Sequence, residues 1–135
     1  MTLEQRKEQA AALHRRGYNC CQCVLAAYAD RLPAGDAAIA LAAGMGGGVG
    51  GQGHICGAVS ALAMLRGAVE PTSPQTKAAV YADVRRLSDA FRDRNGSVTC
   101  RELRSRAEGV AHKPCDEYIA DAIEIFDQYL QQCDA

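Results

Sequence analysis

Tryptophan is absent from this sequence, and other aromatic residues are few. Phe and Tyr together make up 5% of the 135 residues. Because strands are enriched in aromatic and β-branched residues, the shortage of both argues against a β-sandwich or a β-barrel. A dominant charge is missing as well, since 15 basic and 16 acidic residues are interspersed along the chain. This balance lacks the basic patch typical of proteins that bind nucleic acid, so no nucleic-acid partner is expected.

Charged residues are missing altogether between Ala37 and Leu65. Glycines, Gln52 and His54 interrupt this segment, so its apolar pieces are shorter than the ~20 residues that a membrane span requires. No span is therefore predicted. The first residues contain no apolar stretch like that of a secretory signal, which favours a cytoplasmic location. In a reducing cytoplasm, clustered cysteines more often bind metal or perform catalysis than form structural disulfides.

Apolar periodicity and capping signals predict one all-α domain over residues 1–135, a bundle of about six to seven helices. The predicted helices cover 3–17, 19–32, 36–43, 54–66, 74–95, 100–109 and the chain from 115 onward. Capping boxes are predicted at Thr2, Asn19 and Thr99 because a Gln or Glu follows each of them three residues later. The expected buried stripes of the two longest helices are Ala79, Val80, Val84, Leu87 and Phe91, and Ile119, Ala122, Ile123, Phe126 and Leu130.

A glycine-rich loop separates two of these helices. Seven of the ten residues at 44–53 are glycine, so neither a helix nor a strand should persist there. The loop satisfies the GxGxxG pattern, but the strand that precedes this pattern in dinucleotide-binding proteins is missing. We therefore interpret the loop as one that lets backbone or a cofactor approach closely, or that offers N–H groups to an anion.

The chain has seven cysteines, an odd number that rules out complete pairing in intramolecular disulfides. Four of them lie at predicted helix starts: Cys20, Cys56, Cys100 and Cys115. A helix N-terminus carries partial positive charge and free N–H donors, which stabilise a thiolate. If these helix ends converge, they form a polynuclear metal site or a thiol redox centre. The plain alternative is four core cysteines, since free cysteine is often buried.

The remaining cysteines and two histidines have open roles. Cys21 and Cys23 are interpreted as packing residues or auxiliary thiols, although Cys20 and Cys23 formally make a CxxC pair. Cys133 lies near the end of the last helix, where the helix dipole disfavours a thiolate. His54 and His112 precede two of the four cysteines and are either ligands, proton donors or ordinary loop residues.

Several short motifs, taken in order, resemble the C_GCAxxG_C_C family of small bacterial and archaeal redox proteins. The matching segments are Tyr18-Asn19-Cys20, the loop from Gly46 to Gly53, Cys56-Gly57-Ala58, Cys100-Arg101-Glu102-Leu103 and Cys115 with the helix after it. One position departs from the pattern, since Ala61 stands where the family has its last glycine. A similar domain occurs in split-Soret cytochromes, but this chain lacks the Cys-x-x-Cys-His motif of covalent haem.

The resemblance implies a redox role for the four cysteines. The first expectation is an iron–sulfur cluster, or another metal, bound by Cys20, Cys56, Cys100 and Cys115 for electron transfer or sensing. The glycines expected near such a cofactor are Gly46, Gly47, Gly48, Gly53 and Gly57. The alternatives are a cofactor-free thiol–disulfide protein, which would make the chain oxidoreductase-like, and a helical module with structural zinc or core cysteines. The expected partner is an electron-transfer or thiol partner of unknown identity, and an apolar helix face could support a homodimer.

Overall fold

The computed structural model describes residues 1–70, 73–105 and 108–134, and over these residues the chain is all-α. It contains seven α-helices and three short 3-10 helices, with no strand in the described part. The α-helices are α1 (Leu3–Arg15), α2 (Cys20–Ala27), α3 (Gly35–Leu41), α4 (Gly57–Gly67), α5 (Lys77–Asn95), α6 (Cys100–Arg104) and α7 (Cys115–Cys133). The 3-10 helices are η1 (Ala29–Arg31), η2 (Ala42–Gly44) and η3 (Pro74–Thr76). The predicted fold class is confirmed.

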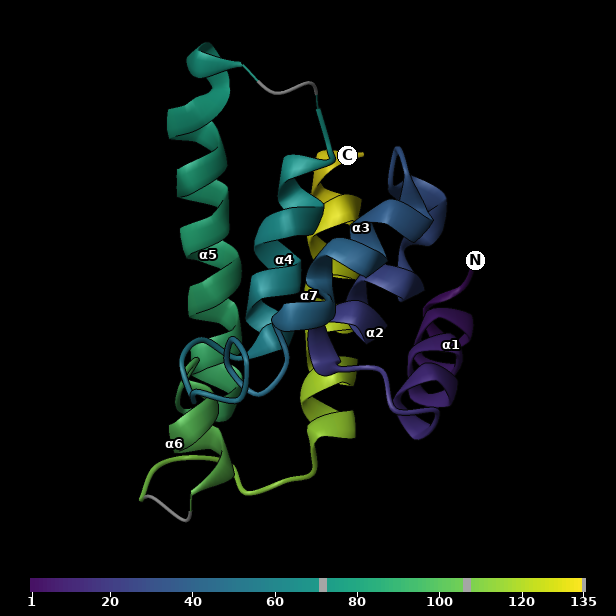
Figure 1. The fold of residues 1–135 in the computed structure, drawn as a ribbon. Helices are drawn as coiled ribbons and strands as arrows, with labels where there is room; N and C mark the ends of the chain where they lie inside the picture. Colours follow the sequence, from purple (N-terminus) through teal and green to yellow (C-terminus); the bar gives the residue numbers. More distant parts are fainter. Residues whose placement is uncertain (71–72, 106–107, 135) are drawn as a thin grey trace.

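Helices α2, α4 and α7 meet at the centre of the bundle. Helix α1 packs on α2 and α7, and α5 packs on α4 and α7, as Figure 1 shows. The glycine-rich loop leads from η2 to α4 and lies beside α6 near the lower end of α5 (Figure 1). No helix in the described ranges combines the length and the apolar character needed to cross a membrane.

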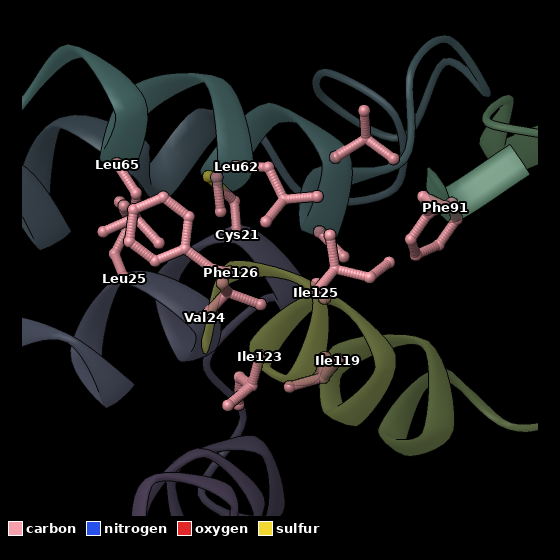
Figure 2. Packing of buried hydrophobic residues seen from close by; sticks show 14 of the residues in the cluster. Cys21, Val24, Leu25, Leu62, Leu65, Phe91, Ile119, Ile123, Ile125 and Phe126 are labelled. Atoms are coloured by element: carbon pink, nitrogen blue, oxygen red, sulfur yellow. The ribbon is translucent and has the colours of Figure 1, made fainter. Parts of the chain in front are cut away.

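The core forms where the three central helices face one another. Figure 2 shows Phe126 of α7 beside Leu25 of α2 and Leu65 of α4. All five residues of the stripe predicted on α7 are buried. On α5 the prediction was only half right: Leu87 and Phe91 are buried, whereas the three apolar residues before them are exposed or half-buried. The first half of α5 therefore lies at the margin of the core, where helical spacing alone does not ensure burial.

Local capping signals set two of the helix starts. The Asn19 side chain accepts a hydrogen bond from the Gln22 N–H at 2.9 Å, and the Gln22 side chain accepts one from the Asn19 N–H at 3.2 Å. The capping box at Thr2 also forms. The box predicted at Thr99 was wrong, because its side chain caps nothing. Thr99 instead forms an antiparallel bridge with Ile55, and its N–H donates to the Ser97 hydroxyl at 3.0 Å.

Several predicted helix boundaries also differ, among them the end of α6 at Arg104 and the start of α5 at Lys77 after a 3-10 turn. Helix α2 ends at Ala27, and the chain continues through a separate 3-10 turn instead of one helix reaching Leu32. Helix α4 begins at Gly57, so Cys56 is its N-cap residue rather than part of its first turn.

Candidate functional site

The structure brings the four cysteines at helix starts to one place. Cys20, Cys56, Cys100 and Cys115 together line a small cavity of about 40 Å³, which we call the cysteine cavity. Cys20, Cys100 and Cys115 are the first residues of α2, α6 and α7, and Cys56 caps α4. Four helix N-termini thus meet around these thiols, which gives them N–H donors and partial positive charge.

Four further residues complete the wall of the cysteine cavity, namely Gly47, Leu103, Arg104 and Tyr118. The last three were not predicted as site residues. Leu103 and Arg104 follow Cys100 by three and four positions, and Tyr118 follows Cys115 by three. Residues at this spacing share a helix face, so helical periodicity from each cysteine was the signal that could have found them.

Tyr118 fixes the geometry of this wall. Its single O–H is shared between two carbonyl acceptors, that of Ala111 and, at 3.3 Å, that of Leu103. The residue is only 2% exposed, and burial raises the pKa of its phenol. Tyr118 therefore acts as a neutral hydrogen-bond donor that ties α6 to the start of α7.

Cys20 is the thiol that the site most favours as a thiolate. Its pKa is lowered to about 6, first by a side-chain hydrogen bond with Cys56 and then by backbone N–H donors that include those of Gly57 and Cys21. Burial acts in the opposite direction but does not cancel these donors. These donors favour the thiolate form of Cys20, and the N-termini of both α2 and α4 stabilise its charge.

Cys56 holds the proton of this pair. Its pKa is raised well above the ordinary range by the hydrogen bond with Cys20, by burial and by the charge on Cys20. The opposite shifts of the two pKa values favour a thiolate at Cys20 beside a thiol at Cys56. A nucleophilic sulfur in contact with a second thiol is the arrangement needed for a disulfide to form between them.

Gly57 allows this contact because it has no side chain. A Cβ at position 57 would overlap the sulfur of Cys20 and would lie 3.0 Å from the backbone nitrogen of Cys21. The Cys-Gly step at 56–57 therefore lets the start of α4 approach the start of α2 closely enough for the Gly57 N–H to reach a sulfur.

The glycine-rich loop adopts an unusual left-handed path. The φ angles from Gly47 to Gly51 are 62°, 72°, 65°, 60° and 76°, five consecutive positive values. Backbone hydrogen bonds span six residues within it, for example from the Gly50 N–H to the Gly44 carbonyl at 2.8 Å. L-residues lose roughly 1–2 kcal/mol in this region, which explains why four of the five are glycine.

Backbone hydrogen bonds fasten the end of this loop to the cysteine cavity. The carbonyl of His54 accepts from the N–H of Cys100 at 2.7 Å, and the N–H of Cys56 donates to the carbonyl of Val98 at 2.8 Å. A Cβ at Gly48 would lie 2.8 Å from the Cβ of Cys100. The loop thus holds Cys56 and Cys100 at a fixed separation.

Of the five glycines expected near a cofactor, Gly47 lines the cysteine cavity. The others lie against protein atoms: Gly46 against Asn19, Gly48 against Cys100, Gly53 against Arg101 and Gly57 against Cys20. Their visible effect is close packing within the protein, and a cofactor-binding role for them stays a prediction.

Comparison with known families matches residues 18–129 to a family described as "Putative redox-active protein (C_GCAxxG_C_C)". The match covers most of the chain and includes all four cysteines of the cavity. The chain belongs to the C_GCAxxG_C_C family. No curated protein and no solved structure matches it. The family description supports redox activity and names neither a cofactor nor a substrate.

The other cysteines of this C_GCAxxG_C_C protein lie outside the cavity lining. Cys21 and Cys23 are fully buried, and burial raises the pKa of each to about 12. The thiol of Cys21 contacts the Met64 sulfur at 3.8 Å within the core, where Figure 2 shows Cys21 near Leu62. Both thus agree with the interpretation as packing residues. Cys133 is exposed at the end of α7.

The fit to a metal is poor in this arrangement. Among the residues that the structure describes, no group of three or more His, Cys, Asp or Glu side chains is placed to hold a metal ion. Zinc needs thiolates at about 2.3 Å on several sides at once. The cavity of about 40 Å³ has room for only a few water molecules. The iron–sulfur cluster and the zinc ion stay predictions of the sequence.

Proposed function

We propose that this protein performs thiol–disulfide exchange, with Cys20 as the nucleophile and Cys56 as the resolving thiol. The observation that carries the proposal is the contact between a low-pKa sulfur and a protonated thiol inside one cavity. A thiol with a pKa near ambient pH combines a high thiolate fraction with retained nucleophilicity. The family description of redox activity supports the same class of chemistry.

The reaction consists of two exchanges. The Cys20 thiolate attacks one sulfur of a disulfide RSSR. The S–S bond breaks, RS⁻ departs, and a mixed disulfide remains on Cys20. Cys56 then gives up its proton to RS⁻ and attacks the Cys20 sulfur, which releases the second RS⁻ to be protonated from solvent. Two protein thiols have been oxidised, and one disulfide has been reduced to two thiols. The reverse sequence transfers the disulfide to a dithiol partner.

The coupling between the two sulfurs favours this order. While Cys20 is anionic, its hydrogen bond and its charge keep the proton on Cys56. The mixed disulfide removes that charge, so burial alone continues to raise the pKa of Cys56. Cys56 therefore becomes easier to deprotonate at the step that requires its thiolate. Cys100 and Cys115 lie on the same cavity and are the remaining thiols able to exchange with Cys20.

Thiol mapping combined with metal analysis tests the proposal. Protein purified without oxygen is treated with a small disulfide, alkylated, digested and analysed by mass spectrometry. We expect loss of two thiols and a peptide pair joined through Cys20 and Cys56. The rival proposal places an iron–sulfur cluster or zinc on the four cysteines. Stoichiometric iron with acid-labile sulfide, or one zinc per chain, together with unchanged thiol counts, would refute the exchange mechanism.

A further inference from the structure

A second, larger cavity adjoins the cysteine cavity. Its volume is about 490 Å³, which falls within the range typical of small-molecule sites. Leu103, Arg104, Cys115 and Tyr118 line both cavities. A molecule bound in the larger cavity therefore touches the wall that encloses the proposed redox thiols, with one of the four cysteines in direct reach.

The larger cavity is cationic. Arg104, His112 and Lys113 line it, and its described lining contains no Asp or Glu. Lys113 is already neutralised, because its ammonium pairs with Asp121 at 2.5 Å. Over residues 1–70, 73–105 and 108–134, Arg104 has no carboxylate within ion-pair distance. Arg104 is therefore the cation available to a ligand, and its guanidinium suits carboxylates and phosphates.

The charge of Arg104 already acts on the redox site. It lowers the pKa of Cys115, although burial and the negative charge of Cys20 outweigh it and leave that pKa raised. A ligand with an acidic group beside its sulfur would place the acid on Arg104 and the sulfur at the wall near Cys115. The wall that such a ligand contacts is held in place, since the Tyr118 hydroxyl is hydrogen bonded to the carbonyls of Leu103 and Ala111.

We propose that this cavity, named here the Arg104 pocket, selects small anionic disulfides and thiols as the exchange partners of the cysteine cavity. The inference rests on the proposed thiol exchange and adds the substrate class to it. Arg104 binds the anionic group, which places the sulfur–sulfur bond beside Cys115 at the wall that the two cavities share, and the Cys20 thiolate attacks it from the cysteine cavity. Cys56 then resolves the mixed disulfide, and the anionic partner leaves as two thiols.

Competition between a charged and an uncharged disulfide tests this selection. Rates of reaction at Cys20 are measured with dithiobis-nitrobenzoate, which carries two carboxylates, and with dithiodipyridine, which is uncharged at neutral pH. The ratio of the two rates is compared between variants, so that the intrinsic reactivity of each reagent cancels. We expect Arg104→Gln to lower the ratio of charged to uncharged rates by about three- to tenfold, as for the loss of electrostatic steering. Arg104→Lys should retain most of the preference.

Arg85→Gln is the matched control, because it removes the same charge from an exposed position on α5 that lines neither cavity. It should leave the ratio unchanged. An unchanged ratio in Arg104→Gln, with Cys20 still reacting with dithiodipyridine, would overturn the Arg104 pocket and leave thiol exchange standing. If Cys20 in the unaltered protein reacts with neither reagent, thiol exchange fails first and the pocket proposal fails with it.

Discussion

Gly57 and Cys20 contact each other where two helices begin. The N–H of Gly57 donates to the Cys20 sulfur, and the space that a side chain would need at position 57 is occupied by that same sulfur. The hydrogen bond forms because position 57 has no Cβ, since the backbone can approach the sulfur this closely only at a glycine. The low pKa of Cys20 thus depends on a residue with no functional group.

Replacing Gly57 with alanine tests this dependence. The new Cβ must push Cys20 or α4 away, which should lower the free energy of unfolding by about 1–3 kcal/mol, as overpacking does in other cores. The pKa of Cys20 should rise because the Gly57 N–H loses its acceptor. Chemical denaturation measures the first effect, and the pH dependence of alkylation at Cys20 measures the second.

Gly67→Ala is the control on the same helix. Nothing lies within 4 Å of a Cβ placed at Gly67, and alanine is the better helix former by up to about 1 kcal/mol. This variant should therefore be neutral or slightly stabilising, with the Cys20 pKa unchanged. Equal effects of the two substitutions would show that the Gly57 contact has no special role.

The pH profile of Cys20 reactivity provides a second prediction. Alkylation by iodoacetamide should rise with a midpoint near pH 6, because the Cys20 pKa is lowered to about 6. Cys56→Ala removes the first cause of that shift, so the midpoint should move up by one or more units. Cys56→Ser keeps a hydroxyl donor and should therefore raise the midpoint of the pH profile by less than Cys56→Ala does. A profile for Cys20 that is the same in the parent protein and in Cys56→Ala would contradict the proposed coupling.

The stability of the protein should also depend on pH through Cys20. Its pKa is near 6 when folded and 9.0 ordinarily, so between these values the unfolded chain binds more protons and stability rises with pH. This contribution is lost as the pH falls through 6. The difference in unfolding free energy between the parent protein and Cys20→Ala should grow from pH 6 to pH 8 by on the order of 1–2 kcal/mol. Cys133→Ala, at an exposed position, should show no such trend under the same reducing conditions.

The other groups with shifted pKa values titrate outside this window. The carboxyls of Asp30, Asp83 and Glu124 have lowered pKa values and affect stability only in acid. The raised pKa of Cys56 acts in alkali, where it makes stability fall with increasing pH. A flat difference between pH 6 and pH 8 would therefore mean that Cys20 is not an anion in the folded protein.

Features set by neighbouring residues could be predicted from the sequence. Asn19 and Gln22 cap α2 through contacts three residues apart, so their pattern was sufficient. The capping box at Thr2 located the start of α1 in the same way. These predictions succeeded because the interactions that decide them lie within one helical turn.

Features set by distant residues could not be predicted in this way. Thr99 has the sequence of a capping box, but its partners are Ser97 and Ile55, the second of which lies far away in the chain. Arg6 of α1 is only 5% exposed and forms an ion pair at 2.6 Å with Asp30, a contact between separate segments that no local pattern indicates. The hydrogen bond between Cys20 and Cys56 likewise depends on where the starts of α2 and α4 meet.

The left-handed loop allows a matched comparison of two glycines. Gly48 and Gly50 both have positive φ angles, of 72° and 60°. A Cβ at Gly48 would collide with the backbone nitrogen of His54 and with the side chain of Cys100. A Cβ at Gly50 meets nothing within 4 Å. Gly50→Ala should cost only the backbone strain of about 1–2 kcal/mol. Gly48→Ala should cost at least 1 kcal/mol more in thermal or chemical unfolding and should slow exchange at Cys20. Equal losses of unfolding free energy in the two variants would mean that backbone strain alone accounts for both.

Val49 is the one residue other than glycine with a positive φ angle in the described part of the chain, at 65°. A β-branched residue is poorly suited to this conformation, whereas asparagine adopts it readily. Its side chain is also 37% exposed, so little buried apolar contact is lost on replacement. Val49→Asn should therefore raise the free energy of unfolding by about 1 kcal/mol. Val69→Asn replaces an exposed valine without positive φ and should give no gain. If Val49→Asn instead destabilises the protein or weakens exchange with disulfide partners, the exposed valine has a contact role that outweighs its strain.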